Sequence, residues 1–175
     1  FHPGVDPRDR PSNLTYDRFV DLLTCARNYS YNESRIAAAA GGCPFLVEDV
    51  FFNVLFAQAA EDTATIIVEL GSRGLPTRSN YAKWAKHAAR SRRAISSFLW
   101  SDQISMYASR NQRTGDLILT RAIGGLSPLF LDASSAAVSS MMRSDELLSM
   151  LRSAEFALPF PVPSLSANSS RFSPR

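Results

Sequence analysis

The segment from about residue 44 to residue 70 constrains the fold most strongly, because apolar residues occupy nearly every face of the helix that it would form. Pro44 is a favoured residue of a first helical turn, and a glycine follows the last apolar residue. A helix without a polar face must be surrounded by other elements to leave water. We therefore predict that this helix is the centre of the core, with Phe51, Val54 and Leu55 buried.

Other segments between the two ends of the chain repeat their apolar residues at helical spacing. Tyr16, Phe19, Val20 and Leu23 form such a stripe behind a possible Thr15 cap. Further helices are predicted after residue 32, from about 79 to 100, from 102 to 110 and from 144 onward, whereas residues 117–119 fit a strand or a helix equally well. The pattern predicts an all-α fold, a compact helical bundle of about five to seven helices with extended N- and C-terminal arms.

Proline-rich segments at both ends indicate arms around one domain. We expect an N-terminal arm at residues 1–12, a helical domain at 13–157 and a Pro/Ser-rich C-terminal arm at 158–175. The C-terminal arm also carries apolar side chains that a solvated linker would not need. These residues are predicted to dock on a neighbouring subunit as an assembly arm: Phe160, Val162, Leu165 and Phe172.

Composition excludes a membrane protein and a disordered chain, since 45% of the residues are hydrophobic and 20% are charged. No apolar run reaches the roughly 18 residues of a membrane span, and residues 1–10 do not resemble a signal peptide. Cys25 and Cys43 match no metal or redox spacing, so free buried thiols are favoured over a disulfide. Sequons at Asn13, Asn28, Asn32 and Asn168 keep a secreted protein open as the minority interpretation.

The most distinctive chemical feature is a basic segment from residue 70 to residue 101 that contains no Asp or Glu. Since the whole chain has a net charge of +3 and this segment carries +7, the remaining residues carry −4. Four of the cations would share one helix face without acidic partners, and phosphate backbones commonly neutralise such a face. An acidic protein surface and a plain solvated face are the alternatives. The predicted nucleic-acid-binding residues are Arg73, Arg78, Lys83, Lys86, Arg90, Arg92 and Arg93, with Tyr81 and Trp84 as possible base-stacking rings.

No catalytic arrangement is recognisable in the sequence. His2 and His87 are the only histidines, and no nucleophile elbow, phosphate loop or zinc-binding motif is present. We therefore predict that the chain is not an enzyme and has no catalytic residue, metal site or cofactor.

These observations favour a structural nucleic-acid-coating protein, such as a coat or nucleocapsid subunit of a filamentous or rod-shaped RNA virus. Its expected partners are RNA, bound through the phosphate backbone without sequence preference, and copies of itself, with no membrane involved. Its expected location is a virion or an intracellular assembly. The alternatives are an accessory subunit of a large organellar complex or ribosome, and a secreted helical effector.

Overall fold

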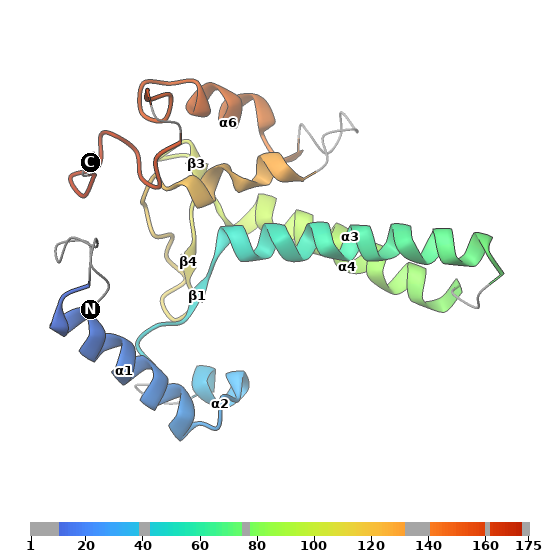
Figure 1. Cartoon of the computed structure of the whole chain (residues 1–175), viewed down its shortest axis with the longest axis horizontal. Coiled ribbons are helices and arrows are strands. Elements are labelled where there is room, and N and C mark those ends of the chain that lie inside the picture. Colours follow the sequence, from blue (N-terminus) through green and yellow to red (C-terminus); the bar gives the residue numbers. More distant parts are fainter. Residues whose placement is uncertain (1–10, 39–42, 75–77, 132–140, 160–161, 173–175) are drawn as a thin grey trace, which may run out of the picture. The chain divides into compact units, whose positions relative to one another are not determined.

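A computed structural model describes residues 11–38, 43–74, 78–131, 141–159 and 162–172. The chain divides into two compact units, Phe1–Leu46 and Val47–Arg175 (Figure 1). Among the described helices, none combines the length and the apolar composition that crossing a bilayer requires.

The first unit contains two helices, α1 (Asn13–Asn28) and α2 (Glu33–Ala38). Ser12 caps α1, because its Oγ accepts a hydrogen bond of 3.2 Å from the Thr15 amide. Asn32 caps α2 in the same way through Oδ1, which lies 3.0 Å from the Arg35 amide nitrogen. The two helices predicted here are confirmed, although the first begins two residues before the predicted Thr15 cap.

A disulfide joins Cys25 of α1 to Cys43, with the two Cα atoms 5.5 Å apart. The prediction of free thiols is therefore wrong. Two cysteines separated by 18 residues gave no spacing signal, because a pairing of this kind depends on how the chain turns between them. The closed loop removes conformational freedom from the unfolded chain and so stabilises the first unit.

The second unit is built on a long antiparallel pair of helices, α3 (Val50–Ser72) and α4 (Arg78–Phe98) (Figure 1). Asp49 sets the start of α3, because its Oδ1 accepts a hydrogen bond of 3.0 Å from the Phe52 amide. The helix starts later than the predicted Pro44 because Val47 and Glu48 are extended and paired with another strand.

The second unit also contains two short antiparallel pairs of strands. β1 (Val47–Glu48) pairs with β4 (Arg110–Asn111), and β2 (Trp100–Ser101) pairs with β3 (Met106–Tyr107). The helix predicted for residues 102–110 is therefore wrong. Met106, Tyr107 and Ala108 are buried in succession, which an amphipathic helix with one wet face would not allow.

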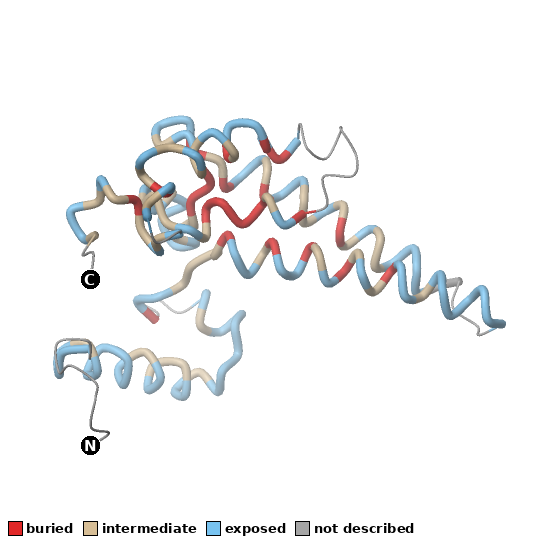
Figure 2. Tube along the Cα trace, turned by 45° about the horizontal axis from the view of Figure 1, so that its top comes forward, coloured by how far each residue is buried: buried red, intermediate tan, exposed pale blue. Residues whose placement is uncertain are grey.

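The remaining elements are the 3-10 helix η2 (Ile123–Phe130) and α6 (Ser144–Leu151). Gly125 is required in η2, since a Cβ there would collide with the Tyr107 carbonyl oxygen. The core of the unit combines buried side chains from helices and strands (Figure 2): Val50, Val54, Ala57, Ile95, Leu99, Met106, Tyr107, Leu126, Leu131, Met142, Leu147 and Phe156. The fold is helix-rich, but its two small sheets leave the all-α bundle only partly supported.

The C-terminal segment returns to the second unit. The Ile123 amide donates to the Ser164 carbonyl oxygen at 3.0 Å, and the Ser166 amide donates to the Arg121 carbonyl oxygen at 2.9 Å. Leu165 forms an isolated β-bridge with Ala122. These contacts fix the segment beside η2 and α6, where it borders the polar cavity described next.

Candidate functional site

A polar cavity of about 410 Å³ opens where the C-terminal segment passes the chain before η2. Its wall includes Ile104, Arg121, Glu155, Ser166, Asn168 and Arg171. Four separate stretches of the second unit thus contribute to one cavity, so its shape depends on how they are joined. Among the described residues of its wall, the charged ones are Arg121, Glu155 and Arg171.

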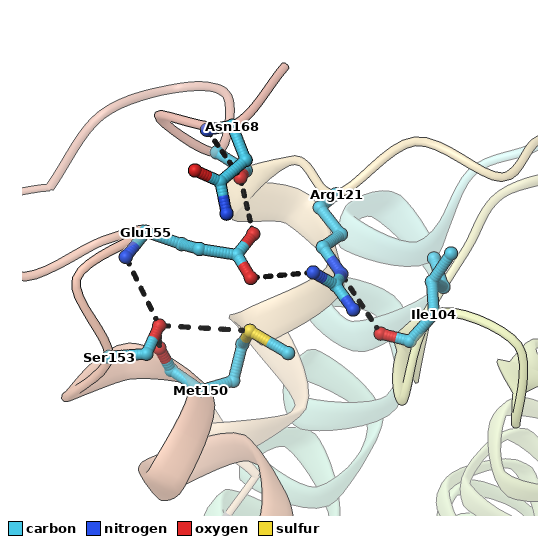
Figure 3. Close-up of polar contacts among 7 residues, drawn as sticks. Ile104, Arg121, Met150, Ser153, Glu155 and Asn168 are labelled. Atoms are coloured by element: carbon cyan, nitrogen blue, oxygen red, sulfur yellow. Dashed lines mark hydrogen bonds and ion pairs between the residues drawn. The ribbon is translucent and has the colours of Figure 1, made fainter.

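Glu155 joins these stretches through both of its carboxylate oxygens (Figure 3). Oε1 accepts a charge-assisted hydrogen bond of 2.5 Å from Nη1 of Arg121, and Oε2 accepts one from the Ser166 hydroxyl. Arg121 also donates from Nε to the Ile104 carbonyl oxygen at 3.2 Å. The cluster therefore fixes the chain after α6, the chain before η2 and the C-terminal segment against one another.

The hydrogen bond from Ser166 is the main cause that lowers the pKa of Glu155 below its ordinary value. Partial burial acts in the opposite direction, and Arg121 lowers the pKa further through its hydrogen bond and its charge. The side chain of Glu155 keeps 15% of its exposure. Glu155 is consequently an ionised acceptor at neutral pH and is poorly suited to act as a general acid.

Arg171 gives the cavity a net positive charge. Arg121 and Glu155 neutralise each other, whereas Arg171 forms no ion pair with any residue that the structure describes. Its guanidinium has the planar donor geometry that suits a carboxylate or phosphate. The arrangement can therefore bind a small polar anion, with Asn168, Ser169 and Ser170 offering further hydrogen-bonding groups beside it.

The predicted nucleic-acid-binding residues lie on α4 and at the end of α3, and none of them lines the polar cavity. Arg73 and the cations Lys83, Lys86, Arg90 and Arg93 are exposed, and so is Tyr81. Trp84 is half-buried and its ring centroid lies 5.7 Å from that of His87. The side chain of Arg78 lies outside the described part of the structure.

Arg92 does not share the exposed basic face. Its side chain is only 12% exposed and forms an ion pair with Glu61 of α3. This pair crosses between the two long helices, so one of the seven predicted cations stabilises the helix pair. The sequence missed this pairing because Glu61 belongs to a different helix from the acid-free segment.

The predicted assembly residues belong to the second unit, and those that are described lie against other parts of it. Leu165 and Phe172 are half-buried, and Val162 borders an apolar groove of about 710 Å³. Phe160 lies outside the described residues. The groove is lined mainly by Phe51, Phe52, Ile123, Leu126 and Phe130.

Sequence reasoning missed Arg121, Glu155 and Ser166 as a group. Arg121 and Glu155 are 34 residues apart, and neither belongs to a local motif. Only the folding back of the C-terminal segment, which the prolines did not reveal, brings Ser166 to Glu155. In the part of the chain that the structure describes, no three His, Cys, Asp or Glu side chains gather as a metal site would need.

Comparison with known proteins gives a consistent result for nearly the whole chain. Residues 3–175 match the family described as the mannosylglycerate hydrolase MGH1-like glycoside hydrolase domain. A mannosylglycerate hydrolase of Rubrobacter radiotolerans is 30% identical over 88% of this chain and 31% of its own length. A glucosylglycerate hydrolase of Mycolicibacterium hassiacum is 37% identical over a shorter stretch, 35% of this chain and 13% of its own.

A solved structure agrees with these sequence matches. The GH63 mannosylglycerate hydrolase of Thermus thermophilus, in complex with Tris and D-glycerate, superposes with a TM-score of 0.73 at 25% identity. The match covers 97% of this chain and 38% of that one. The chain thus spans a little over a third of that structure and 31% of the Rubrobacter radiotolerans enzyme.

These matches overturn the functional predictions made from the sequence. The family and the relatives are hydrolases, so the predictions of a non-enzymatic coat or nucleocapsid subunit, of RNA and self-assembly as partners, and of a virion location are wrong. The two alternatives, an accessory complex subunit and a secreted effector, are not supported either. The exposed basic face was an insufficient basis, because a solvated helix also explains it.

Proposed function

We propose that this chain forms part of an enzyme that cleaves a glycosidic bond. The reason is that the chain belongs to the mannosylglycerate hydrolase MGH1-like family of glycoside hydrolase domains. The observation that supports this most directly is the polar cavity with its excess positive charge at Arg171. A hydrolase with such a cavity suits a small glycoside whose aglycone carries a carboxylate. The substrate class that we propose is a hexosylglycerate.

The charge of the cavity supports this class of substrate. Glycerate carries one carboxylate, and the cavity carries one positive charge that Glu155 does not neutralise. A bidentate contact between Arg171 and the glycerate carboxylate would add specificity as well as affinity. The sugar hydroxyls would exchange hydrogen bonds with Asn168 and with the serines beside it.

Glu155 has a positioning role in this proposal. Glycoside hydrolysis usually requires two carboxyl groups on opposite sides of the bond, one of which must be protonated to donate to the leaving oxygen. Glu155 has a lowered pKa and uses both oxygens to bind Arg121 and Ser166, so it cannot supply that proton. It is the only carboxylate among the described residues that line the cavity.

We therefore propose a division of labour within the complete enzyme. The polar cavity of this chain binds and orients the carboxylated end of the substrate. We place the carboxyl groups that transfer protons and activate water outside this cavity. The chain spans only 31% of the Rubrobacter radiotolerans enzyme and 38% of the Thermus thermophilus structure. Orientation of this kind contributes to rate because it removes freedom before the reaction begins.

The test is a substrate panel with the natural gene product that contains these residues. Mannosylglycerate and glucosylglycerate are compared with the corresponding methyl glycosides, and release of free hexose is measured. The glycerate-bearing substrates should have a kcat/KM roughly tenfold to hundredfold higher, since a charge-assisted contact is worth about 1.5–3 kcal/mol. The ratio between the mannosyl and glucosyl compounds then identifies the sugar.

Two results would contradict this proposal. Equal kcat/KM values for glycerate-bearing and methyl glycosides would show that the enzyme does not recognise the substrate carboxylate. An absence of hexose release from every substrate, in a protein whose circular dichroism shows folded helices, would remove the hydrolase activity itself.

A further inference from the structure

The outer face of α3 carries a continuous apolar stripe. Its members lie three or four residues apart, apart from one adjacent pair, Leu55 and Phe56, and this spacing places them on one face. The stripe consists of Phe52, Leu55, Phe56, Ala59, Thr63, Ile66 and Leu70, with Thr63 as its single polar member. We call this set the outer stripe of α3.

The outer stripe lies opposite the face of α3 that is buried. Val50, Val54, Ala57, Ala60 and Ala64 are the buried residues of the helix, and they turn toward the rest of the second unit. At 100° per residue, the centres of the two sets are about half a turn apart. α3 is therefore apolar on both its covered and its uncovered face. Figure 2 shows buried and exposed positions alternating along the helix.

The exposure of the stripe is large for a soluble protein. Phe52 is 72% exposed and Ile66 is 57% exposed, and Phe56 and Leu55 are also exposed. The stripe extends along a helix of 23 residues, and a contiguous apolar surface of this kind usually marks an interface. Exposed large apolar residues are otherwise expected to occur singly.

The apolar groove continues this surface at the start of α3. Phe51 and Phe52 form one wall of the groove, and Ile123 and Phe130 of η2 form another. Phe130 is 71% exposed although it is a large aromatic residue. The stripe and the groove together form an extended seam rather than an isolated pocket.

We propose that this seam is the packing surface for further helices of the same hydrolase domain, contributed by polypeptide outside these 175 residues. The structural relative aligns with 97% of this chain, and this chain covers only 38% of that relative. Most of such a domain is therefore polypeptide that the chain does not contain. An elongated seam on a helix fits an amphipathic helix packed ridge into groove.

A second copy of this chain is the competing occupant, and the pattern of α3 argues against it. α3 is apolar on two opposite faces, and its charged residues Asp62 and Glu69 are exposed between them. A helix with two apolar faces is typical of a position between other elements of a larger domain. A homodimer surface would more usually have a polar rim around an apolar centre. The outer stripe instead remains apolar from the first turn of α3 to the last, except for Thr63.

The inference is tested by cysteine accessibility in the natural gene product that contains these residues. Ala59→Cys and Ile66→Cys place thiols on the outer stripe, and Glu69→Cys is the matched control on an exposed flank of the same helix. Ala59→Cys adds only one sulfur atom, so its folding is a minor concern. Each protein reacts with a maleimide in native buffer and in denaturant, without reduction of the Cys25–Cys43 disulfide.

The two stripe thiols should react at least about a hundredfold more slowly in native buffer than in denaturant, while the Glu69→Cys thiol reacts at similar rates in both. Fast native labelling of both stripe thiols would overturn the inference. Protection that disappears on dilution would overturn it too, because it would assign the seam to a second copy. The measurement needs no substrate, so protected thiols in a protein that hydrolyses no glycoside would reject the proposed function and leave this inference standing.

Discussion

Glu155 shows how much of the site depends on single side chains. It accepts hydrogen bonds from Arg121 and Ser166, and its own backbone carbonyl oxygen accepts from the Ala167 amide at 3.0 Å. The residue therefore holds the C-terminal segment both through its carboxylate and through its backbone. Its removal should loosen the wall of the cavity before it affects the distant core.

Replacement of Glu155 by Gln should lower the free energy of unfolding at neutral pH by about 1–3 kcal/mol, the usual value of hydrogen bonds to a charged group. Because the folded state lowers the pKa of Glu155, its stabilisation is present above the ordinary pKa of glutamate and is lost as the pH falls through the lowered value. The variant should therefore show a flatter loss of stability in acid. Urea unfolding at several pH values measures both effects.

Glu69→Gln serves as the control for that series, since Glu69 is exposed on α3. An identical pH profile for the Glu155→Gln variant and the parent chain would show that the cluster contributes nothing to folding.

The sequence alone did not predict this cluster of side chains. Arg121 and Glu155 have no local signature, and their pairing depends on the course of the chain through η2 and α6. Ser166 reaches Glu155 only because the C-terminal segment folds back. Asn32, by contrast, was placed correctly before the second helix, because capping depends on residues only three positions apart. Local chemistry was predictable and the chemistry between distant residues was not.

At the scale of elements, α3 is the informative case. Its existence was predictable from periodicity, and the predicted burial of Val54 is confirmed at 0% exposure. Phe51 and Leu55, however, are 41% and 44% exposed, so their predicted burial within this chain is wrong. The all-round apolarity predicted neighbours on every side of the helix, whereas the described residues of this chain cover it on one side.

Val54→Ala and Leu55→Ala form a neighbouring pair that measures this difference in the 175-residue chain. Val54→Ala should cost about 1–3 kcal/mol of unfolding free energy, because it removes buried methyl groups from the core. Leu55→Ala should cost well under half as much, since its side chain is largely exposed. Chemical denaturation of both variants gives the comparison, and equal losses would mean that the outer stripe is covered within this chain.

For residues 102–110 the sequence predicted a helix, whereas the structure has short strands between residues 100 and 111. Met106, Tyr107 and Ala108 are buried consecutively, and Ser105 has a positive φ of 49° that reverses the chain before them. A short apolar run does not distinguish a strand from a helix by period, and the turn depends on one residue in an uncommon conformation. The predicted helix failed for this reason.

At the scale of the whole molecule, a regional charge imbalance was a poor guide to function. The acid-free segment is real, but Arg92 pairs with Glu61 of α3 and the exposed cations lie on one face of α4. The family was not recognisable from a local motif. Similarity over residues 3–175 supplied what no short pattern contained.

We propose that Arg171 binds the substrate carboxylate, and steady-state kinetics of an Arg171→Gln variant of the natural gene product measure this contribution. Arg90→Gln, on the exposed face of α4, is the matched control. We predict that Arg171→Gln raises the KM for the hexosylglycerate substrate roughly tenfold to hundredfold, with kcat within about threefold and with the KM for a methyl glycoside unchanged. Unchanged KM for the hexosylglycerate in the Arg171→Gln variant, or an equal rise in the Arg90→Gln variant, would show that Arg171 does not bind the substrate carboxylate.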